Sequence, residues 1–503
     1  MRLDNKLKKQ FTLDNFKTIF NDLVKSKTDV YSNKVLIPIG VDGIEYENIR
    51  NNPNHHGKAL CKRALSGKYL FSPFREKEIP KAPFAKHEIV EARAAKKTRT
   101  LSICTIRDTI FQTMIYNSIY DYTDKKIQKF DEAIYGYRKN KSVVLAIDKI
   151  QEYIHQGYMY GIDGDIEKFF DKINHKKMLN KINRFFKNDL LVVKYLTRFL
   201  KVKRVPCENT LTRKEYKYKK AVAIPRTLGI PQGGVLSGIL ANIYLYNFDR
   251  YISFTLSKNY DIKYIRYADD FLILCKNAND VKPLYDKLFN YLKRESLKLH
   301  PIDMSAINNS ITDKDKKTKA INFYNKTYID FLGFRISPNH IGIKYDNIIK
   351  FKNSIKFIIK ECKKEHKDFY TTLHKINGRI LGNAIYANDL FVKCKFCDKP
   401  QKPQSWIGFF NGITDLRQVK SLDIWIRRQL FNYYFETTNT RLPKNYFKVK
   451  HYCEPRYWYF NNLESLFSLY KQIKEFKKLH PDIEFCKCEK YEPLEDFTLS
   501  WFV

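Results

Sequence analysis

The chain has 503 residues, of which 44% are hydrophobic, so it is long enough for more than one core and too apolar for a disordered protein. The 92 Lys and Arg residues against 54 Asp and Glu give a formal net charge of +38. This favours a nucleic-acid partner over a solvated basic surface or a membrane, because phosphates relieve self-repulsion and release counterions.

The N-terminal stretch MRLDNKLKKQFTLDNF lacks the apolar segment of a signal peptide, and no run of the sequence reaches membrane-spanning length. We therefore expect a cytoplasmic protein without a membrane partner, in which the ten cysteines stay reduced.

The first half of the chain alternates helical patterns, basic loops and strands. Residues 1–160 mix short helical patterns with basic loops, notably AKKTRTLSI at 95–103. The next stretch, YMYGIDGDIEKFF, predicts a strand that leads into a helix, with Asp165 at the end of the strand. A basic and aromatic segment at 201–220 predicts a hairpin or a pair of loops. GIPQGGVLSGILANIYL, 229–245, predicts a Gly-rich turn that runs into an apolar helix.

Two adjacent aspartates, Asp269 and Asp270, stand in YIRYADDFLIL at 264–274. One interpretation is a tight hairpin turn, which Asp-Asp suits. The other is that the turn points both carboxylates at metal ions, since neighbouring like charges raise each other's pKa unless positive charge neutralises them. Asp165, on a neighbouring strand, would complete the set. Two Mg²⁺ ions held by these three residues would activate a 3′-hydroxyl and stabilise the leaving pyrophosphate.

Beyond about residue 345 the pattern changes to helices. Three apolar stripes with helical spacing are expected to pack into a core, and they consist of Ile355, Ile359, Cys362, His366 and Phe369, then Val419, Leu422, Ile426, Leu430 and Tyr433, then Leu466, Leu469, Ile473, Phe476 and Leu479. The sequence thus predicts an α+β body with a basic helical C-terminal lobe.

Cys394 and Cys397 have the spacing of half a zinc site. Cys486 with Cys488, or His451 with Cys453, would complete it. The spacing of the second cysteine pair is unusual, and cysteine is often a small buried hydrophobic residue. A structural Zn²⁺ ion is therefore the less favoured interpretation.

Taken together, these motifs resemble bacterial reverse transcriptases of the group II intron-like lineage. YADD at 267–270, with Arg266 and Phe271 as flanks, is similar to the active-site box of that family. The other similar blocks are the first catalytic motif at 164–175, the substrate-binding motif at 229–245, finger-region blocks at 39–49, 96–108 and 135–147, and the primer-gripping FLGF at 331–334. The blocks follow the family's order over roughly residues 35–340, with a weak continuation around LDIWIRR at 422–428.

The resemblance implies a right-hand polymerase. Its N-terminal extension and fingers would occupy 1–160, and an antiparallel-sheet palm would occupy 161–345 with a finger insertion at about 180–225. A helical thumb and C-terminal RNA-binding lobe would occupy 346–503. The implied enzyme is an RNA-directed DNA polymerase that takes an RNA template and dNTPs and makes DNA with two Mg²⁺ ions.

The resemblance also implies roles for single residues. Asp165, Asp269 and Asp270 would be catalytic, and Ile166 would join them at the metal ions. Gln232 and Tyr267 would lie at the template and nucleotide, and Leu332 with Gly333 would form the primer grip. Each of these assignments is an expectation that the structure can place in space.

Three further residues have a plainer alternative beside their implied role. Phe170 would be the steric gate that collides with a ribose 2′-hydroxyl, although ordinary core packing is its alternative. Lys97 and Arg99 would contact the incoming triphosphate, where a guanidinium matches phosphate geometry. Their alternative is a solvated basic loop.

The sequence departs from the family pattern at two positions. Gly238 follows Ser237 where the family usually has proline, which would loosen the start of the next helix. Met304 stands where the family commonly places a lysine that protonates the departing pyrophosphate, so Lys298, His300 or water would have to replace it.

Two functions within this family stay open. A stand-alone polymerase that copies a dedicated noncoding RNA in antiphage defence, as in the unknown-group enzymes, is favoured by the complete aspartate set and by a C-terminal lobe without an intron-nuclease pattern. The alternative is a maturase that acts mainly as an intron RNA-binding splicing factor through a basic surface in 345–480. An RNA polymerase is disfavoured by Phe170 and by the YADD box. The template, the priming mode and the choice between monomer and homo-oligomer stay open.

Overall fold

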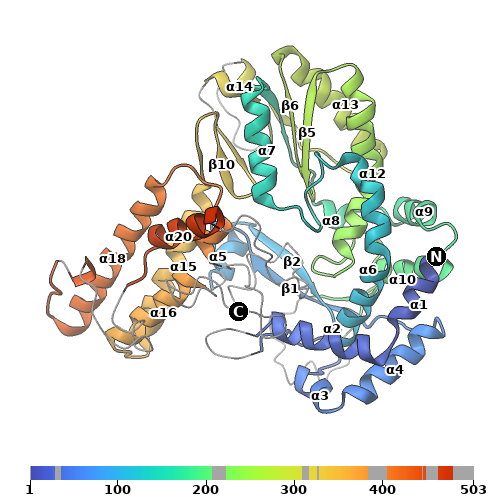
Figure 1. Ribbon diagram of the computed structural model, residues 1–503, viewed down its shortest axis with the longest axis horizontal. Helices are drawn as coiled ribbons and strands as arrows, with labels where there is room; N and C mark the ends of the chain where they lie inside the picture. The colour runs from blue at the N-terminus through green and yellow to red at the C-terminus, as the bar shows by residue number, and fades with distance from the viewer. Residues whose placement is uncertain are drawn as a thin grey trace.

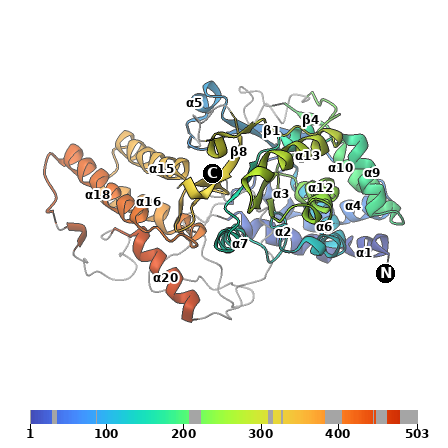
Figure 2. The same ribbon diagram turned by 90° about the horizontal axis from the view of Figure 1, so that it is seen from above.

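The computed structural model describes residues 2–28, 35–85, 87–206, 222–308, 316–325, 328–382, 405–444, 446–448 and 463–479. The chain is a mixed α+β protein, as the sequence predicted, and its helices surround three small sheets (Figures 1 and 2). The helices are α1 (Leu3–Gln10), α2 (Leu13–Ser26), α3 (Tyr46–Asn51), α4 (Pro53–Leu65), α5 (Ile89–Ala94), α6 (Ile106–Ile127), α7 (Val143–His155), α8 (Phe169–Lys172), α9 (His175–Phe185), α10 (Leu190–Leu200), α12 (Ser237–Phe254), α13 (Val281–Arg294), α14 (Ser305–Asn308), α15 (Tyr345–Lys364), α16 (Phe369–Leu381), α17 (Trp406–Phe409), α18 (Arg417–Thr438) and α20 (Leu466–Leu479). The strands are β1 (Phe74–Pro80), β2 (Thr98–Ile103), β3 (Tyr160–Gly164), β4 (Arg204–Val205), β5 (Ile262–Tyr267), β6 (Asp270–Cys275), β7 (Ile302–Asp303), β8 (Thr318–Asn322), β9 (Ile329–Phe331), β10 (Phe334–Ile336) and β11 (Ile341–Ile343).

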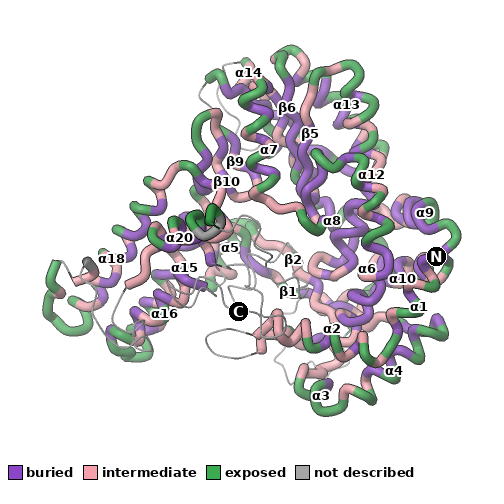
Figure 3. The backbone as a smooth tube through the Cα atoms, viewed as in Figure 1, coloured by how far each residue is buried: buried purple, intermediate pink, exposed green. Residues whose placement is uncertain are grey.

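The largest sheet has the strand order β5-β6-β3-β8-β7 and separates two cores. Its neighbours pair antiparallel except for β7 and β8, which run parallel. Side chains alternate between the faces of a strand, so Phe271 and Ile273 enter one core and Leu272 and Leu274 enter the other. The apolar run FLIL is therefore buried on both sides (Figure 3).

The first core lies between this sheet and the helices α6, α9, α10, α12 and α13. The apolar helix predicted after the Gly-rich turn is α12, which begins at Ser237. Gly238 lies buried in its first turn, so the missing proline does not prevent the helix from starting there.

Two smaller sheets flank the central one, with the strand orders β2-β1-β4 and β11-β10-β9. In the first, β1 pairs antiparallel with β2 over the register Arg75↔Ile103 to Pro80↔Thr98. In the second, β10 pairs antiparallel with both neighbours. The basic loop predicted at 95–103 is thus largely a strand, β2.

The helices α15, α16, α18 and α20 form the predicted helical C-terminal lobe (Figure 1). The second and third predicted stripes coincide with α18 and α20. The five residues predicted for α18 are all buried, whereas in α20 Leu479 is 68% exposed.

The first predicted stripe is wrong in its continuity. The helix α15 ends at Lys364, and a new helix, α16, starts at Phe369. His366 adopts φ +49°, which breaks the helix, and the Asp368 side chain accepts a hydrogen bond from the Thr371 N–H at 2.8 Å to cap α16. A side-chain cap inside an apolar stripe therefore overrides the helical period.

Several predictions fall on residues that lie outside the described ones. These are Cys394, Cys397, His451, Cys453, Cys486 and Cys488, together with 207–220 of the predicted hairpin segment. Within the described ranges, no helix combines the length and the apolar character needed to cross a membrane.

Candidate active site

The two adjacent aspartates lie at a β-hairpin turn. Tyr267 pairs with Asp270 at the ends of β5 and β6, so Ala268 and Asp269 form the two-residue turn, with Ala268 at φ +57°. On the neighbouring strand, Gly164 pairs with Phe271, and the next residue, Asp165, continues this register across from Asp270. The hairpin and β3 therefore bring the three predicted carboxylates together. Both interpretations of the aspartate pair, tight turn and projecting carboxylates, apply to this geometry.

These carboxylates repel one another. Burial and the neighbouring Asp165 raise the pKa of Asp269 to about 6. Desolvation by the surrounding protein is the largest cause of the pKa of Asp270, which is raised well above its usual range, and the carboxylates of Asp269, Asp163 and Asp165 raise it further. The residue as a whole is nevertheless exposed. Asp163, on the same strand face as Asp165, has a pKa raised to about 7 by burial. Burial and the neighbouring carboxylates thus favour the protonated form of these aspartates.

In the described part of the chain, no group of three or more His, Cys, Asp or Glu side chains is placed so that it could hold a metal ion. Mg²⁺ seldom needs such a group, since it binds through one or two carboxylates and completes its octahedron with water and substrate phosphates. The donors here are hard carboxylate oxygens whose mutual repulsion a cation would relieve. The donor chemistry of these residues therefore suits Mg²⁺, with water and substrate phosphates as its further ligands.

Asp165 has a basic surrounding. Its N–H donates to Thr318 Oγ1 at 3.2 Å, and its Oδ2 lies 3.7 Å from His300 Nε2 and 3.8 Å from Lys317 Nζ. Of the residues expected to replace the missing lysine, His300 is the one beside this carboxylate, whereas Lys298 forms an ion pair with Glu167 at 3.0 Å.

The remaining residues of this segment pack into the fold. Met304 packs against the first core. Ile166 is 1% exposed, and its backbone bridges to Leu299. The segment around His300 is thereby fixed next to β3.

The Gly-rich turn is joined to β2. The Gln232 carbonyl accepts a hydrogen bond from the Ser102 N–H at 2.7 Å, and Gly233 adopts φ +99° at this close approach. Because β2 also carries Arg99, this hydrogen bond joins the predicted template residue, Gln232, to the strand that carries a predicted triphosphate residue.

Lys81, directly after β1, is a site residue that the sequence did not single out. Burial and the cations Lys317 and Arg99 lower its pKa, and Asp165 and Asp269 oppose that shift, so its ammonium lies among these groups. Its N–H donates to the Lys97 carbonyl at 2.8 Å, and both lysines are exposed at the residue level. The pairing of β1 with β2 is what brings Lys81 here, and the sequence alone does not reveal that pairing.

Phe170 lies at the N-terminal end of α8 and is 6% exposed. Its ring meets Phe169 at 5.3 Å and Tyr137 at 6.4 Å between centroids, both edge-on. Its carbonyl accepts a hydrogen bond from the Ile230 N–H at 2.8 Å, which ties it to the Gly-rich turn. The core-packing alternative therefore describes Phe170 in part, and more fully its neighbour Phe169 at 1% exposure.

Leu332 and Gly333 form the two-residue turn between β9 and β10, at φ +50° and +86°. Positive φ at both positions is the requirement of a type I′ hairpin turn. The Gly333 carbonyl accepts hydrogen bonds from the Lys344 N–H at 3.0 Å and from Asn347 Nδ2 at 3.2 Å. Lys344 also lowers the pKa of Asp163 and Asp270, so its ammonium faces the carboxylates.

Arg266 anchors the aspartate hairpin from behind. The side chain is fully buried and binds Asp249 through two hydrogen bonds of 2.7 Å, from Nε to Oδ1 and from Nη2 to Oδ2. Its Nη1 donates to Asn242 Oδ1 at 3.1 Å and to the Ala268 carbonyl at 2.8 Å. Tyr267 is also buried, which raises the pKa of its phenol to about 12. The carboxylates therefore stand on a rigid turn.

Comparison with known proteins gives a family and several distant relatives. The profile of the family described as "Reverse transcriptase (RNA-dependent DNA polymerase)" matches residues 79–336, half of the chain. The group II intron-encoded protein LtrA of Lactococcus lactis is 26% identical over 301 residues, which cover 58% of this chain and 41% of LtrA. The protein YkfC of Escherichia coli K12 is 25% identical over 271 residues, or 48% of this chain and 64% of YkfC. The match therefore spans less than two thirds of either relative.

Proposed function

This chain belongs to the reverse transcriptase family, and from that premise we propose that it is an RNA-directed DNA polymerase. The observation that carries the proposal is the meeting of Asp165, Asp269 and Asp270 where β3 reaches the β5–β6 hairpin, with Lys81 beside them. The proposed substrates are an RNA template, a primer end and dNTPs, and the product is DNA.

Each group of residues would have a separate role in nucleotidyl transfer. Bound by the three aspartates, two Mg²⁺ ions would supply a Lewis acid for the primer 3′-hydroxyl and for the leaving pyrophosphate. Lys81 and Arg99 would bind the triphosphate from the β1–β2 side, where a guanidinium and an ammonium match phosphate oxygens. His300, whose Nε2 lies 3.7 Å from Asp165, would hold the proton for the leaving group.

We further propose the division of the chain into fingers up to residue 160, a palm over 161–345, and a thumb with an RNA-binding lobe beyond it. In this arrangement Gln232 lies at the template, Tyr267 at the nucleotide, and Leu332 with Gly333 under the primer. These assignments follow the family and agree with the observed joining of the Gly-rich turn to β2.

Replacement of Lys81 by alanine is expected to lower kcat/KM for dNTP by about 10- to 100-fold, mainly through KM, because an ammonium next to the triphosphate is lost. Lys97→Ala is the matched comparison, since Lys97 is also an exposed lysine and its carbonyl accepts the hydrogen bond from the Lys81 N–H. Steady-state kinetics of single-nucleotide addition measure both. A larger effect of Lys97→Ala would return the triphosphate contact to the lysine that the sequence favoured.

Phe170→Ala is expected to admit ribonucleotides, because the ring that would collide with a 2′-hydroxyl is gone. The measurement is primer extension with each dNTP and the matching rNTP, read as the ratio of kcat/KM. Phe169→Leu serves as a control for loss of aromatic core packing next to the gate. Unchanged sugar selection in Phe170→Ala would show that Phe170 is only a core residue.

Within the family, we propose a stand-alone polymerase that copies a dedicated noncoding RNA, serving antiphage defence. The support is the complete aspartate set, which DNA synthesis with two Mg²⁺ ions requires. The alternative is a maturase, which is favoured by the relative named a group II intron-encoded protein. Purifying the protein with its retained RNA and sequencing that RNA separates them: a discrete short RNA copied into DNA supports the first, and retained intron RNA without DNA synthesis supports the second.

A further inference from the structure

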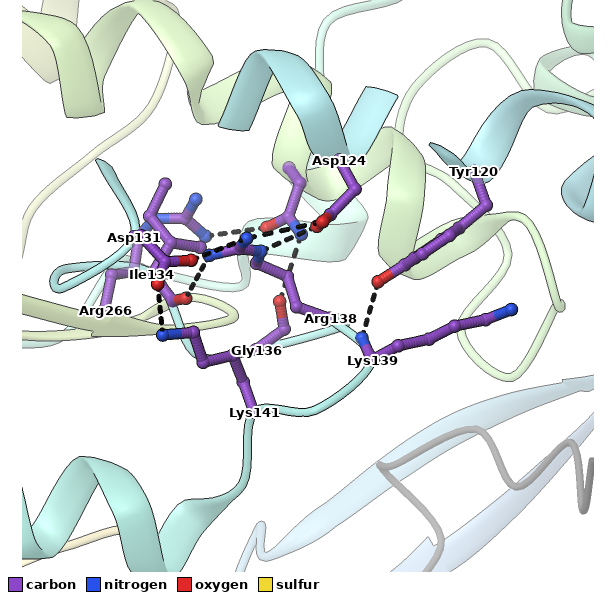
Figure 4. A network of polar contacts seen from close by, with 10 residues as sticks. Tyr120, Asp124, Asp131, Ile134, Gly136, Arg138, Lys139, Lys141 and Arg266 are labelled. Carbon is purple, nitrogen blue, oxygen red and sulfur yellow. Dashed lines mark hydrogen bonds and ion pairs between the residues drawn. The ribbon is translucent and has the colours of Figure 1, made fainter. Parts of the chain in front are cut away.

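The loop at 133–139 lies next to the aspartate hairpin, and Figure 4 shows polar contacts that hold it. Arg138 binds Asp124 at 2.7 Å and Asp131 at 2.9 Å. Asn242 Nδ2 donates to the Gly136 carbonyl at 3.0 Å. A Cβ atom on Gly136 would lie 2.3 Å from the Ala268 nitrogen, so the loop backbone touches the hairpin turn itself. These contacts therefore hold the loop backbone next to the aspartate hairpin.

Tyr137 is the strained residue of this loop. Its backbone has φ +58°, a left-handed conformation that is rare for an aromatic residue. Its hydroxyl is buried and has no hydrogen-bond partner among the described residues. Both features carry an energetic cost, and such costs are more often retained at functional positions than elsewhere. The tyrosine thus calls for an explanation other than stability.

The ring of Tyr137 fills the space that Gly238 leaves empty. A Cβ atom on Gly238 would lie 2.3 Å from Tyr137 Cδ1 and 2.5 Å from Cγ, so no residue with a side chain fits there without moving the ring. Gly238 is also the position at which the sequence departs from the usual Ser-Pro. The glycine and the tyrosine are therefore a matched pair from separate parts of the chain.

The same ring meets Phe170 edge-on, at 6.4 Å between centroids and 84° between planes. Phe169 contacts Phe170 at 81°. Edge-to-face aromatic contacts hold rings in a defined orientation. Removing the Tyr137 ring would free the Phe170 side chain to rotate into the vacated space.

We propose that Tyr137, seated against Gly238, fixes the Phe170 ring and thereby sets how strictly the site rejects ribonucleotides. This inference rests on the proposed function, in which Phe170 is the sugar gate. Tyr137 is a positioning residue, since it acts through Phe170 and not through contact with the nucleotide.

The test compares kcat/KM for a dNTP and its rNTP in single-nucleotide primer extension. Tyr137→Ala is expected to lower the discrimination by about 10-fold or more, with kcat for dNTP changed little. Tyr137→Phe is expected to keep the discrimination, because it keeps the ring. Gly238→Ala is expected to lower it, because the new Cβ displaces the ring. The double variant Gly238→Ala, Tyr137→Ala should match Tyr137→Ala alone, since the collision is absent.

Tyr251→Ala is the control for loss of a partly buried tyrosine ring. Tyr251 stacks on Tyr291 at 4.5 Å and lies 13 residues beyond Gly238 on α12, about 20 Å along the helix axis. Its discrimination should equal that of the wild type. If Tyr137→Ala does not fold, Tyr137→Leu and Gly238→Ala provide the same comparison.

Unchanged discrimination in Tyr137→Ala, with reduced discrimination in Phe170→Ala, would overturn this inference and leave the gate intact. A loss in Tyr137→Phe as large as in Tyr137→Ala would overturn it too, since the hydroxyl and not the ring would then act. Unchanged discrimination in Phe170→Ala would instead remove the gate on which the inference rests, and absence of DNA synthesis by the wild type would remove the proposed function.

Discussion

Asp269→Asn is expected to lower DNA synthesis by about a thousandfold or more, because a metal-bound carboxylate supplies several kcal/mol of transition-state stabilisation. The amide keeps the size of the side chain but not its charge. Asp286→Asn is the matched control, since Asp286 is an exposed carboxylate on α13. Single-turnover primer extension with Mg²⁺ measures the effect for both variants.

The same substitution is expected to leave the fold intact and to raise the melting temperature measured without divalent cations. The reason is that Asp269 is one of several carboxylates that raise each other's pKa, so that a neutral side chain removes repulsion. Substitutions at active-site positions commonly raise the stability of the fold while they lower the activity. A lower melting temperature would assign Asp269 to the fold, and full activity of the variant would refute the proposed site.

Arg266→Ala has the largest expected effect on stability, a loss of about 3–5 kcal/mol in the free energy of unfolding, because it leaves the Asp249 carboxylate buried without its counter-charge. Among the described residues, the Tyr264 hydroxyl would remain as a hydrogen-bond donor to Asp249, at 2.8 Å. The Ala268 carbonyl would lose its donor, so the aspartate turn would also lose its anchor.

Denaturant unfolding measures this loss, with Arg335→Ala as the control. Arg335 binds Asp330 at 2.9 Å, but both side chains are partly exposed, at 32% and 26%. Such a pair contributes about 1 kcal/mol or less. Equal effects of the two substitutions would contradict the account of Arg266 as the buried support of the hairpin.

The strand β3, the hairpin at Asp269 and Asp270 and the positions of the three aspartates could be predicted from the sequence because each has a local signal, whereas β2 was predicted as a basic loop. Asp165 ends a strand, and Asp269 and Asp270 interrupt two apolar runs. The apolar stripes of α18 and α20 likewise carry their own period. The pairing of β3 with β6, which places the carboxylates together, follows from those signals once the strands share a sheet.

The sequence did not reveal features that depend on pairing between distant strands or on the cap of a single helix. Lys81 reaches the carboxylates only because β1 pairs with β2. The break between α15 and α16 depends on His366 and on the Asp368 cap, which the apolar period does not record. Gly238 was expected to loosen a helix, but its partner, Tyr137, lies a hundred residues earlier in the sequence. The assigned roles of single residues stay predictions.

DNA synthesis on an RNA template, with the three aspartates as catalytic residues, is the proposed activity of this protein. The most direct measurement supplies a defined RNA, an annealed DNA primer, dNTPs and Mg²⁺ to the wild-type protein and to Asp269→Asn, and sequences the extended strand. We expect DNA complementary to the RNA from the wild type and none from the variant. Extension that ignores the template sequence, or equal extension by both proteins, would contradict it.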